Sequence, residues 1–440
     1  MTGRARPLRG KLDVYLMPAI VGGGLGDIEE VLLAGRRLAS VGGSPILFRL
    51  PGRPSPRSVE GPWGWPRLKR TDSLQPRAPR AMTLSAWWGV SAAPGRDEPY
   101  GRAGPWAPEC AAIDRAYGPG RVLHVSFEEF ARTFTSREQV AERWREGGVP
   151  VREIRRRLRE PDTARAILEF HEAFARFRAF DRPEVLHLYG TFLPSRAFHR
   201  EFPEAVQCGP FWPEAAPGRG RRVPGRWVWY ASPGSSPLLA ARLAEGWEPS
   251  LAPVRIEVRA PGKFPLPSAP NLRWSWLRPL ARPAWRRRFA DSGLKIVTGS
   301  RTLLEALVDG GPFLYFNGVL GHGAFARRHR PEKIDALLAL WRSWGVPASL
   351  RHDLAEFSRA RSVGPVLARA RSDPDWRRRF PRRLRSDGFR TPYDDAGELI
   401  ERTARAFAAG RWSAAEVVAA LRSGAGPPRA LTRRAHHPPA

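Results

Sequence analysis

Three short stretches of this sequence carry residue types that can hold a phosphate group or move a proton. The first is GGGLGD at residues 22–27. Glycine lets backbone N–H groups approach an oxyanion closely, and a following helix adds partial positive charge. A carboxylate beside a hydroxyl group can accept its proton. The candidate residues are Gly23, Gly24 and Gly26 for binding, and Asp27 as the base. A tight structural turn is the alternative interpretation, because neither a dinucleotide fingerprint nor a P-loop is complete here.

The second stretch is SPGSS at residues 232–236, which follows a Trp-rich apolar run. Backbone N–H groups and hydroxyls in such a turn can cradle a phosphate. The candidate residues are Ser232, Gly234, Ser235 and Ser236. A helix N-cap with a turn is the alternative interpretation.

The third stretch, at residues 295–316, has the most specific pattern. An apolar strand ends at Thr298, Gly299 and Ser300 turn the chain, and Thr302 begins a helix. Glu305 is expected in the first turn of this helix, where a carboxylate can bind the paired hydroxyl groups of a ribose. A favourable interaction of Glu305 with the helix dipole is the alternative.

The elements around these stretches alternate between strands and helices. Short apolar runs predict strands at 12–21, 46–48, 121–126, 185–189, 227–231, 254–258, 294–297 and 313–316. Helical spacing of apolar residues predicts helices at 28–41, 136–180, 237–246 and 302–308. Such alternation is typical of α/β proteins with mainly parallel sheets, in which ligands bind beyond the carboxyl ends of the strands.

The chain is long enough for two domains, and a Pro/Gly/Arg-rich stretch at 213–226 marks the boundary. We expect an N-terminal domain, a C-terminal domain, an Arg-rich helical segment and a flexible tail. Their ranges are 1–215, 216–345, 346–424 and 425–440. Residues 51–120 are rich in Pro, Gly, Trp and Arg, which predicts a long functional loop or an inserted excursion.

The composition is that of a basic globular protein. Of the 440 residues, 42% are hydrophobic and 26% are charged, which argues against a disordered chain. The formal net charge is +30, and all but five of the 73 basic residues are arginine. Such a surface attracts anions, whether nucleotide phosphates, anionic lipid head groups or nucleic acid.

We expect a cytoplasmic protein, because the sequence has no signal-peptide pattern and no apolar run of about 18 residues. The two cysteines lack the spacing of a metal site. Tryptophan and arginine gather in 51–107, a combination suited to a membrane interface. Loop tryptophans that fold back on the body of the protein are the alternative.

Residues 291–316 resemble the donor-binding segment of GT-B glycosyltransferases, in particular the MurG-like N-acetylglucosaminyltransferases and the UDP-glycosyltransferases. The matching residues are Thr302, Glu305, Ala306, Gly311 and Pro312. The resemblance implies two Rossmann-like domains that face each other across a cleft. It also implies that Glu305 holds the ribose of a nucleotide-sugar donor, a UDP-sugar in preference to others. Gly299, Ser300 and Thr302 would line its diphosphate, and Thr298 is a further donor-binding residue.

The same resemblance implies a role for each of the other two stretches. Residues 232–236 are similar to the loop that faces the donor, and residues 22–27 to the loop that faces the acceptor. Asp27 stands where these families usually have a histidine. Asn317 and His322 follow the last strand, where related enzymes read the sugar, although the usual acidic or amide pair is not evident.

The resemblance implies an inverting transfer that needs no bound metal and no cofactor other than the nucleotide-sugar substrate. The pair of glutamates typical of retaining enzymes is missing, since the eighth positions before and after Glu305 are Val297 and Phe313. Asp373 and Asp375 form a DxD pattern, but they lie in an Arg-rich helical region and not after a strand. His187, on a strand, is read as a structural histidine.

Two other functions stay open. One is a catalytically inactive GT-B-like protein that binds nucleic acid or a protein partner through its Arg-rich 351–390 section. The other is an epimerase that acts on the nucleotide-sugar itself. The acceptor of a transferase is unidentified. A lipid-linked acceptor, peripheral association with the inner face of an anionic membrane, and non-specific nucleic-acid binding are all compatible with the charge.

Overall fold

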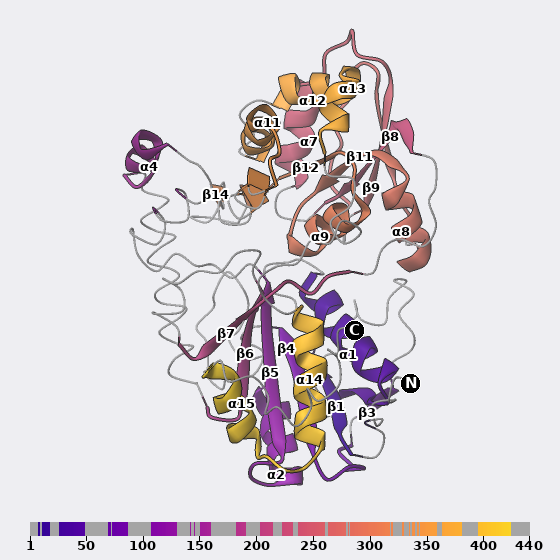
Figure 1. The fold of residues 1–440 in the computed structure, drawn as a ribbon. Helices are drawn as coiled ribbons and strands as arrows, with labels where there is room; N and C mark the ends of the chain where they lie inside the picture. The colour runs from indigo at the N-terminus through magenta and orange to yellow at the C-terminus, as the bar shows by residue number, and fades with distance from the viewer. Residues whose placement is uncertain are drawn as a thin grey trace, which may run out of the picture.

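The computed structural model describes a large part of the chain, arranged around two parallel sheets (Figure 1). The described residues are 8, 11–17, 26–48, 69–71, 73–86, 107–129, 141, 145, 150–159, 182–190, 203–213, 222–231, 236–259, 263–278, 280, 282–316, 318–319, 328–329, 334, 337–338, 341–342, 344–358, 363–380 and 395–423. No helix in this part of the chain is both long and apolar enough to cross a membrane.

The first sheet has seven parallel strands in the order β3-β2-β1-β4-β5-β6-β7. The strands are β1 (Asp13–Met17), β2 (Ser44–Phe48), β3 (Lys69–Thr71), β4 (Ala81–Ala86), β5 (Val122–Glu129), β6 (Val185–Gly190) and β7 (Ala205–Cys208). Strands β1 and β6 are buried along their whole length. That is expected of strands covered on both faces, and it explains why apolar runs predicted them.

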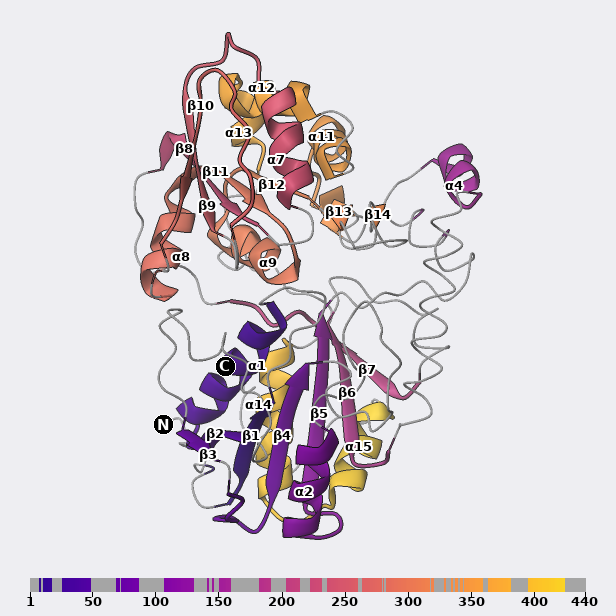
Figure 2. The ribbon, with the colours of Figure 1, turned by 180° about the vertical axis from the view of Figure 1, so that it is seen from behind.

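Helices from both ends of the sequence cover the first sheet (Figures 1 and 2). They are α1 (Gly26–Ser40), α2 (Ala107–Tyr117), α14 (Ala396–Ala408) and α15 (Ala414–Arg422). The C-terminal pair shares one hydrophobic core with the first sheet, to which Ile400, Phe407 and Val418 contribute. The chain therefore returns to its first domain after completing the second.

The second sheet has five parallel strands in the order β10-β9-β8-β11-β12. The strands are β8 (Val223–Tyr230), β9 (Val254–Arg259), β10 (Leu272–Trp276), β11 (Ser292–Val297) and β12 (Phe313–Tyr315). The register between β8 and β11 shifts between Ser292 and Leu294. A Cβ atom at Gly293 would lie 2.6 Å from the carbonyl oxygen of Pro224, so this shift requires glycine.

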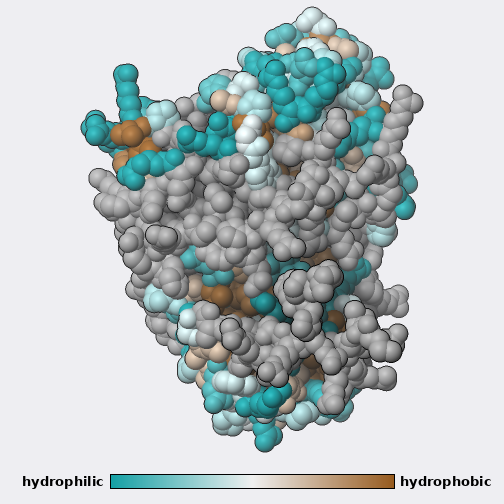
Figure 3. Space-filling model, viewed as in Figure 1, coloured by the Kyte–Doolittle hydropathy of each residue, from teal (hydrophilic) through white to brown (hydrophobic). Residues whose placement is uncertain are grey.

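Two groups of helices flank the second sheet (Figure 2). Between the strands come α7 (Ser236–Glu245), α8 (Arg282–Ala290) and α9 (Ser300–Asp309). After β12 come α11 (Ala348–Ser358), α12 (Val363–Ser372) and α13 (Pro374–Arg378). The remaining described elements are α4 (Val151–Arg157) and a small antiparallel pair, β13 (Gly318–Val319) with β14 (Arg328–His329). The described surface over α12 and α13 is hydrophilic (Figure 3).

The Arg-rich segment expected at 346–424 is divided between the two cores. Leu354, Leu367 and Trp376 of α11, α12 and α13 pack into the second core, whereas α14 and α15 pack on the first sheet. An amphipathic helix shows which of its faces is apolar, but its sequence does not show which sheet that face covers.

The expectation of a long loop at 51–120 was wrong for part of this range. It contains β3, β4 and α2, and β4 pairs with β1 on one side and with β5 on the other, in the middle of the sheet. The sequence of β4, AMTLSA, has no β-branched aliphatic residue and follows two prolines, Pro76 and Pro79, so it lacks the usual signal of a strand.

The two-domain α/β architecture agrees with the sequence prediction, and each sheet reverses its strand order at one place. In the first sheet the reversal lies between β1 and β4, and in the second between β8 and β11. Ligands of doubly wound sheets bind outside the carboxyl ends of the strands at such a reversal. The carboxyl ends of the strands at these two reversals are therefore the candidate ligand-binding positions.

Candidate functional site at the two strand reversals

Hydrogen bonds join the carboxyl ends of the central strands of the second sheet. The hydroxyl of Thr298, just after β11, donates to the carbonyl oxygen of Tyr230 at the end of β8 at 2.8 Å. The amide of Ala231 donates to the carbonyl oxygen of Arg259 at the end of β9 at 2.8 Å. These bonds fix the ends of three neighbouring strands, so the loops that leave them start from defined positions.

Gly299 forms the turn that leaves β11 for α9. Its φ of 89° and ψ of 164° lie in a region that essentially only glycine adopts. The residue is exposed, and a Cβ atom added there would meet no atom within 4 Å. Gly299 is the N-cap residue of α9 and has no side chain with which to accept from the first N–H groups of the helix. The turn is thus suited to an anionic oxygen.

Thr298 and Thr302 use their hydroxyl groups within the turn. Both side chains are buried, and the hydroxyl of Thr302 donates to the carbonyl oxygen of Thr298 at 2.9 Å. These two residues therefore hold the shape of the turn. Any contact they make with a ligand would come from their backbone.

Glu305 lies in the second turn of α9, and not in the first as expected, because the helix begins at Ser300. Its carboxylate is 1% exposed and lies 3.3 Å from Nη1 of Arg286. The indole N–H of Trp285 donates to it at 3.4 Å. The carboxylate of Glu305 therefore interacts with Arg286 and Trp285 of α8, and it lies too far along α9 to interact with the dipole at the start of its own helix.

Glu305 belongs to a buried ionic network beneath α9. Arg286 also pairs with Asp309, whose Oδ1 lies 2.6 Å from Nη2 of the arginine. Lys295 on β11 is fully buried, and its Nζ donates to the carbonyl oxygen of Gly310 at 2.7 Å. Burial lowers the pKa of Lys295 to about 7, although the charge of Asp309 opposes this. The second domain thus holds several charges in its interior.

Arg259 brings a positive charge to the same edge. It ends β9, is 6% exposed, and its guanidinium carbon lies 4.3 Å from the ring centroid of Trp285 and 5.6 Å from that of Tyr230. Such stacking holds a guanidinium in a fixed place. Arg259, Trp285 and Arg286 were missed from sequence, and the one available signal was the arginine that ends the alternating run VRIEVR.

The other predicted residues lie at the expected starts of helices or outside the described part of the chain. Gly26 and Asp27 are the first residues of α1, Ser236 begins α7, and Ser300 begins α9, with only their backbone described. The predicted residues outside the described part are Gly23, Gly24, Ser232, Gly234, Ser235, Asn317 and His322. Both predicted loops nevertheless connect a strand end to a helix start at a strand reversal.

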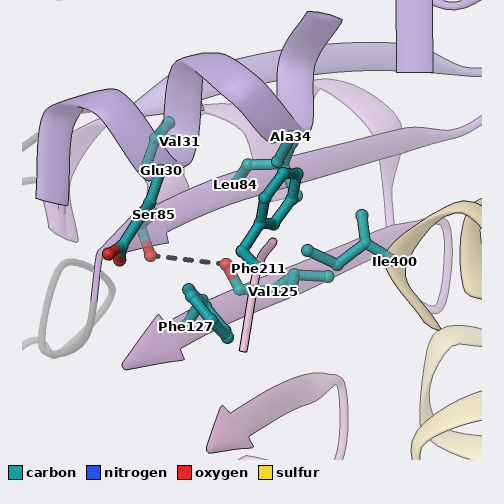
Figure 4. A pocket seen from close by; sticks show the side chains of 9 residues that line it. All are labelled: Glu30, Val31, Ala34, Leu84, Ser85, Val125, Phe127, Phe211 and Ile400. Atoms are coloured by element: carbon teal, nitrogen blue, oxygen red, sulfur yellow. Dashed lines mark hydrogen bonds between the residues drawn. The ribbon is translucent and has the colours of Figure 1, made fainter. Parts of the chain in front are cut away.

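The carboxyl edge of the first sheet holds a small apolar hollow of about 10 Å³, partly open to solvent, which is room for about one water-sized molecule (Figure 4). Its lining residues are Glu30, Val31, Ala34, Leu84, Ser85, Val125, Phe127, Phe211 and Ile400. Glu30 and Ser85 lie together at one end, and Ile400 lies at the other (Figure 4). Glu30 was not predicted as a site residue, because in the sequence it is one of several polar residues of an amphipathic helix.

Phe211 connects this hollow with the second domain. Its ring lines the hollow and stands edge-on to Phe127, with ring centroids 6.5 Å apart. Its carbonyl oxygen accepts a hydrogen bond of 2.7 Å from Nη1 of Arg301, the second residue of α9. Helix α1 also contacts α9. The two edges therefore lie close to each other.

Metal-binding groups do not gather in the described part of the chain, where no three His, Cys, Asp or Glu residues lie close enough to hold an ion. The aspartates of the DxD pattern have structural partners. Asp373 caps α13 by accepting from the amides of Asp375 and Trp376 at 2.8 and 3.0 Å, and Asp375 pairs with Arg378.

Comparison with known proteins finds similarity in the arrangement of the backbone and not in the sequence. No protein-family model matches the chain, and no curated protein matches its sequence. A UDP-glucosyltransferase from Polygonum tinctorium is similar at 11% identity and a TM-score of 0.40, covering 95% of this chain and 98% of that one. MurG of Acinetobacter baumannii is similar at 12% identity and a TM-score of 0.35, covering 79% and 94%. T4 phage BGT in complex with UDP and Mn2+ is similar at 9% identity and a TM-score of 0.31, covering 83% and 97%. At these values the likeness carries no argument about chemistry.

Proposed function

We propose that this protein is a glycosyltransferase. It takes a sugar from a nucleoside diphosphate donor, UDP in preference to GDP or ADP, and transfers it to an acceptor held at the first sheet. The observation that carries the proposal is the turn at Gly299, which opens the N-terminus of α9 at the strand reversal of the second sheet. Anionic ligands bind at this place in doubly wound sheets.

In this proposal the second sheet binds the donor. The first amides of α9 hold the diphosphate, and Arg259 adds positive charge from the neighbouring strand end. Glu305 binds the ribose hydroxyls. The indole of Trp285 donates to this carboxylate at the long distance of 3.4 Å. A carboxylate has about four lone-pair sites, so it has capacity for a ribose as well as for α8. Because this carboxylate is 1% exposed, the proposal requires α8 or the Glu305 side chain to shift when the donor binds.

The first sheet binds the acceptor in this proposal. The hollow is lined mainly by apolar side chains, with Glu30 and Ser85 at one end (Figure 4). In this proposal the apolar body of the acceptor packs against these side chains, and its hydroxyl group lies toward the end with Glu30 and Ser85. Asp27, the second residue of α1, accepts the proton of that hydroxyl.

The proposed reaction is a single displacement. The acceptor oxygen forms a bond to the anomeric carbon while the bond from that carbon to the diphosphate breaks. The proton passes to Asp27, and the negative charge that develops on the diphosphate is stabilised by the amides of α9 and by Arg259. In a single displacement the acceptor oxygen attacks the face of the anomeric carbon opposite the diphosphate, so the proposed reaction inverts the configuration. These groups supply the needed positive charge without a metal ion.

The structure gives less support to the alternative of a binder that acts through its 351–390 section. Several arginines there have partners inside the second domain. Arg369 pairs with Asp353 at 2.5 Å, Arg371 donates to the carbonyl oxygen of Ala252 at 3.1 Å, and Arg378 pairs with Asp375. Arginines with such partners contribute to packing, so their number alone does not indicate a nucleic-acid surface.

Calorimetric titration with UDP, GDP and ADP tests the proposed donor site. We expect saturable binding, strongest for UDP, that weakens at least tenfold in Glu305→Gln, a loss equivalent to about 1.4 kcal/mol. Gln keeps the size of the side chain and an oxygen for Trp285, so the variant should fold. Asp375→Asn is the control, because Asp375 is an exposed carboxylate of the same domain. Absence of binding by all three nucleotides would reject the proposal and favour the non-catalytic alternative.

A further inference from the structure

Three arginines occupy one register position on three neighbouring strands of the second sheet. Arg226 on β8 pairs with Arg255 on β9, and Arg255 pairs with Arg273 on β10. Neighbouring strands lie about 4.8 Å apart, so the three side chains leave the sheet within roughly 10 Å. We call them the arginine row.

The arginine row lies on the sheet face that carries α8. Nε of Arg255 donates to Oγ of Ser275 at 3.1 Å, and side chains two positions apart along a strand share a face. Glu257, on this face, accepts from Nε of Arg288 on α8 at 2.6 Å. Strand β10 forms the outer edge of the sheet, on the same side of the molecule as α8 (Figure 2).

The charges of the row are poorly compensated. Glu257 lies on the same face, but Arg288 binds its carboxylate with two nitrogens, while Arg255 approaches it only to 4.0 Å. Arg226 donates to the carbonyl oxygen of Asp291 at 3.5 Å, and its Nε has no partner in the part of the chain that the structure describes. Arg273 is exposed and makes no hydrogen bond or ion pair there. Like charges directly opposite each other destabilise a sheet.

Two further exposed arginines lie near the row and add to its positive charge. Arg287 on α8 and Arg278, five residues beyond Arg273 along the chain, are exposed. The half-buried indoles of Trp274 and Trp276 belong to the opposite face, where they pack against Trp229 and Phe264. The row therefore lacks the aromatic platform on which the bases of single-stranded nucleic acid stack. A second copy of this chain, with its own net charge of +30, is not a complementary partner either.

We propose that the arginine row docks the protein on a membrane surface that carries anionic phospholipids. A broad patch of guanidinium groups at the edge of a sheet complements a planar array of phosphates, and each arginine adds to the attraction at such a surface. Large apolar side chains do not surround it in the described structure, apart from Val223, which is 44% exposed at the start of β8. Docking is thus electrostatic, and increasing salt weakens it.

Sedimentation with vesicles tests this proposal. We compare vesicles of phosphatidylcholine with vesicles that also contain phosphatidylglycerol, at about 0.1 M salt, where the Debye length is about 10 Å. The double variant Arg255→Gln, Arg273→Gln should lose roughly 10- to 30-fold in partitioning to the anionic vesicles. The control is Arg152→Gln, Arg155→Gln on α4, which removes the same charge from exposed positions far from the row (Figure 1). It should remain within about threefold of the wild type.

Equal losses in the two double variants would overturn the proposal, since net charge alone would then explain binding. It would also fail if the wild type did not sediment with anionic vesicles. A parallel titration with duplex DNA shows whether the row binds nucleic acid instead of a membrane. If the row variant lost DNA binding but kept vesicle binding, the occupant would be nucleic acid and the membrane proposal would be wrong. Thermal unfolding of both variants checks that they fold.

Discussion

The carboxyl edges of the two sheets have the same topological position but different chemistry. At the first edge an apolar hollow contains Glu30 and Ser85 at one end. At the second edge a glycine turn opens a helix N-terminus above a buried network of Arg286, Glu305 and Asp309. In doubly wound folds the topology determines where a ligand can bind. The side chains at that position determine which kind of ligand binds there.

This difference matches the two halves of the proposed reaction. A mainly apolar hollow stabilises a neutral molecule with an apolar body. Oriented amides and a fixed guanidinium stabilise a diphosphate, and they do so most strongly as charge develops on it. Arg301 donates to the carbonyl oxygen of Phe211, so one hydrogen bond connects the two edges.

The buried network should matter most for the second domain. Replacing Arg286 with Met leaves Glu305 and Asp309 buried without their shared cation, so we expect a loss of roughly 3–5 kcal/mol in the free energy of unfolding. Urea unfolding measures this loss. Arg287→Met is the matched control, because Arg287 is exposed, and it should change stability by no more than about 0.5 kcal/mol. Equal effects of the two would contradict the role of the network.

Lys295 should give the second domain a pH dependence. Its pKa is lowered from 10.5 to about 7 by burial, so between these values the unfolded chain binds more protons than the folded one. The free energy of unfolding should therefore rise with pH in this window, by at most about 1.4 kcal/mol per pH unit from this group. The destabilisation is fully present below pH 7. In Lys295→Met this part of the slope should disappear, as urea unfolding at several pH values would reveal.

Gly299→Ala should separate the stability of the turn from binding. A side chain in this backbone region costs roughly 1–3 kcal/mol, even though the space around it is open. The amides of α9 would shift, and UDP binding should weaken. Gly345→Ala provides the control, since Gly345 has a φ of 70° and equally open surroundings but lies away from the strand reversal. It should lose stability and keep its affinity for UDP in calorimetry.

A substitution in the hollow should weaken binding there and leave the donor edge unaffected. Ala34→Leu adds apolar volume to the hollow, so a small aromatic alcohol such as 2-naphthol should bind roughly tenfold more weakly, a loss of about 1.4 kcal/mol. Its affinity for UDP should not change. The control is Ala368→Leu on α12, which enlarges a half-buried alanine of the second domain. This variant should not change the affinity for 2-naphthol, which is measured by fluorescence. Weaker UDP binding in Ala34→Leu would argue against two separate edges.

The sequence predicted much of the framework, because most strands are short runs of large apolar residues. Strands β6 and β9 were found in this way, and so was the succession of a strand and a helix at both strand reversals. Strand β4 was not found, because its small and polar residues are buried by its position in the middle of the sheet and not by their own hydrophobicity. Helix α8 was missed because arginines surround its few apolar residues.

The candidate site was predictable only where its residues are near in sequence. Residues 298–305 form one continuous segment, the turn after β11 and the start of α9, and their spacing indicated a ligand-binding edge. Arg259 and Trp285 meet across a distance of 4.3 Å, but they are far apart along the chain and α8 brings them together. The burial of Glu305 depends on the same helix. Contacts of this kind depend on packing between elements, which a local pattern does not contain.

Hydrogen exchange with and without UDP tests the central claim most directly. In the proposed complex the first amides of α9 hold the diphosphate, so peptides that cover residues 299–305 should exchange more slowly when UDP is bound. Peptides that cover β5, at the first sheet, should not change. Protection confined to the second sheet edge is the result that the account predicts. UDP binding that leaves residues 299–305 unprotected, or that protects only the first domain, would contradict it.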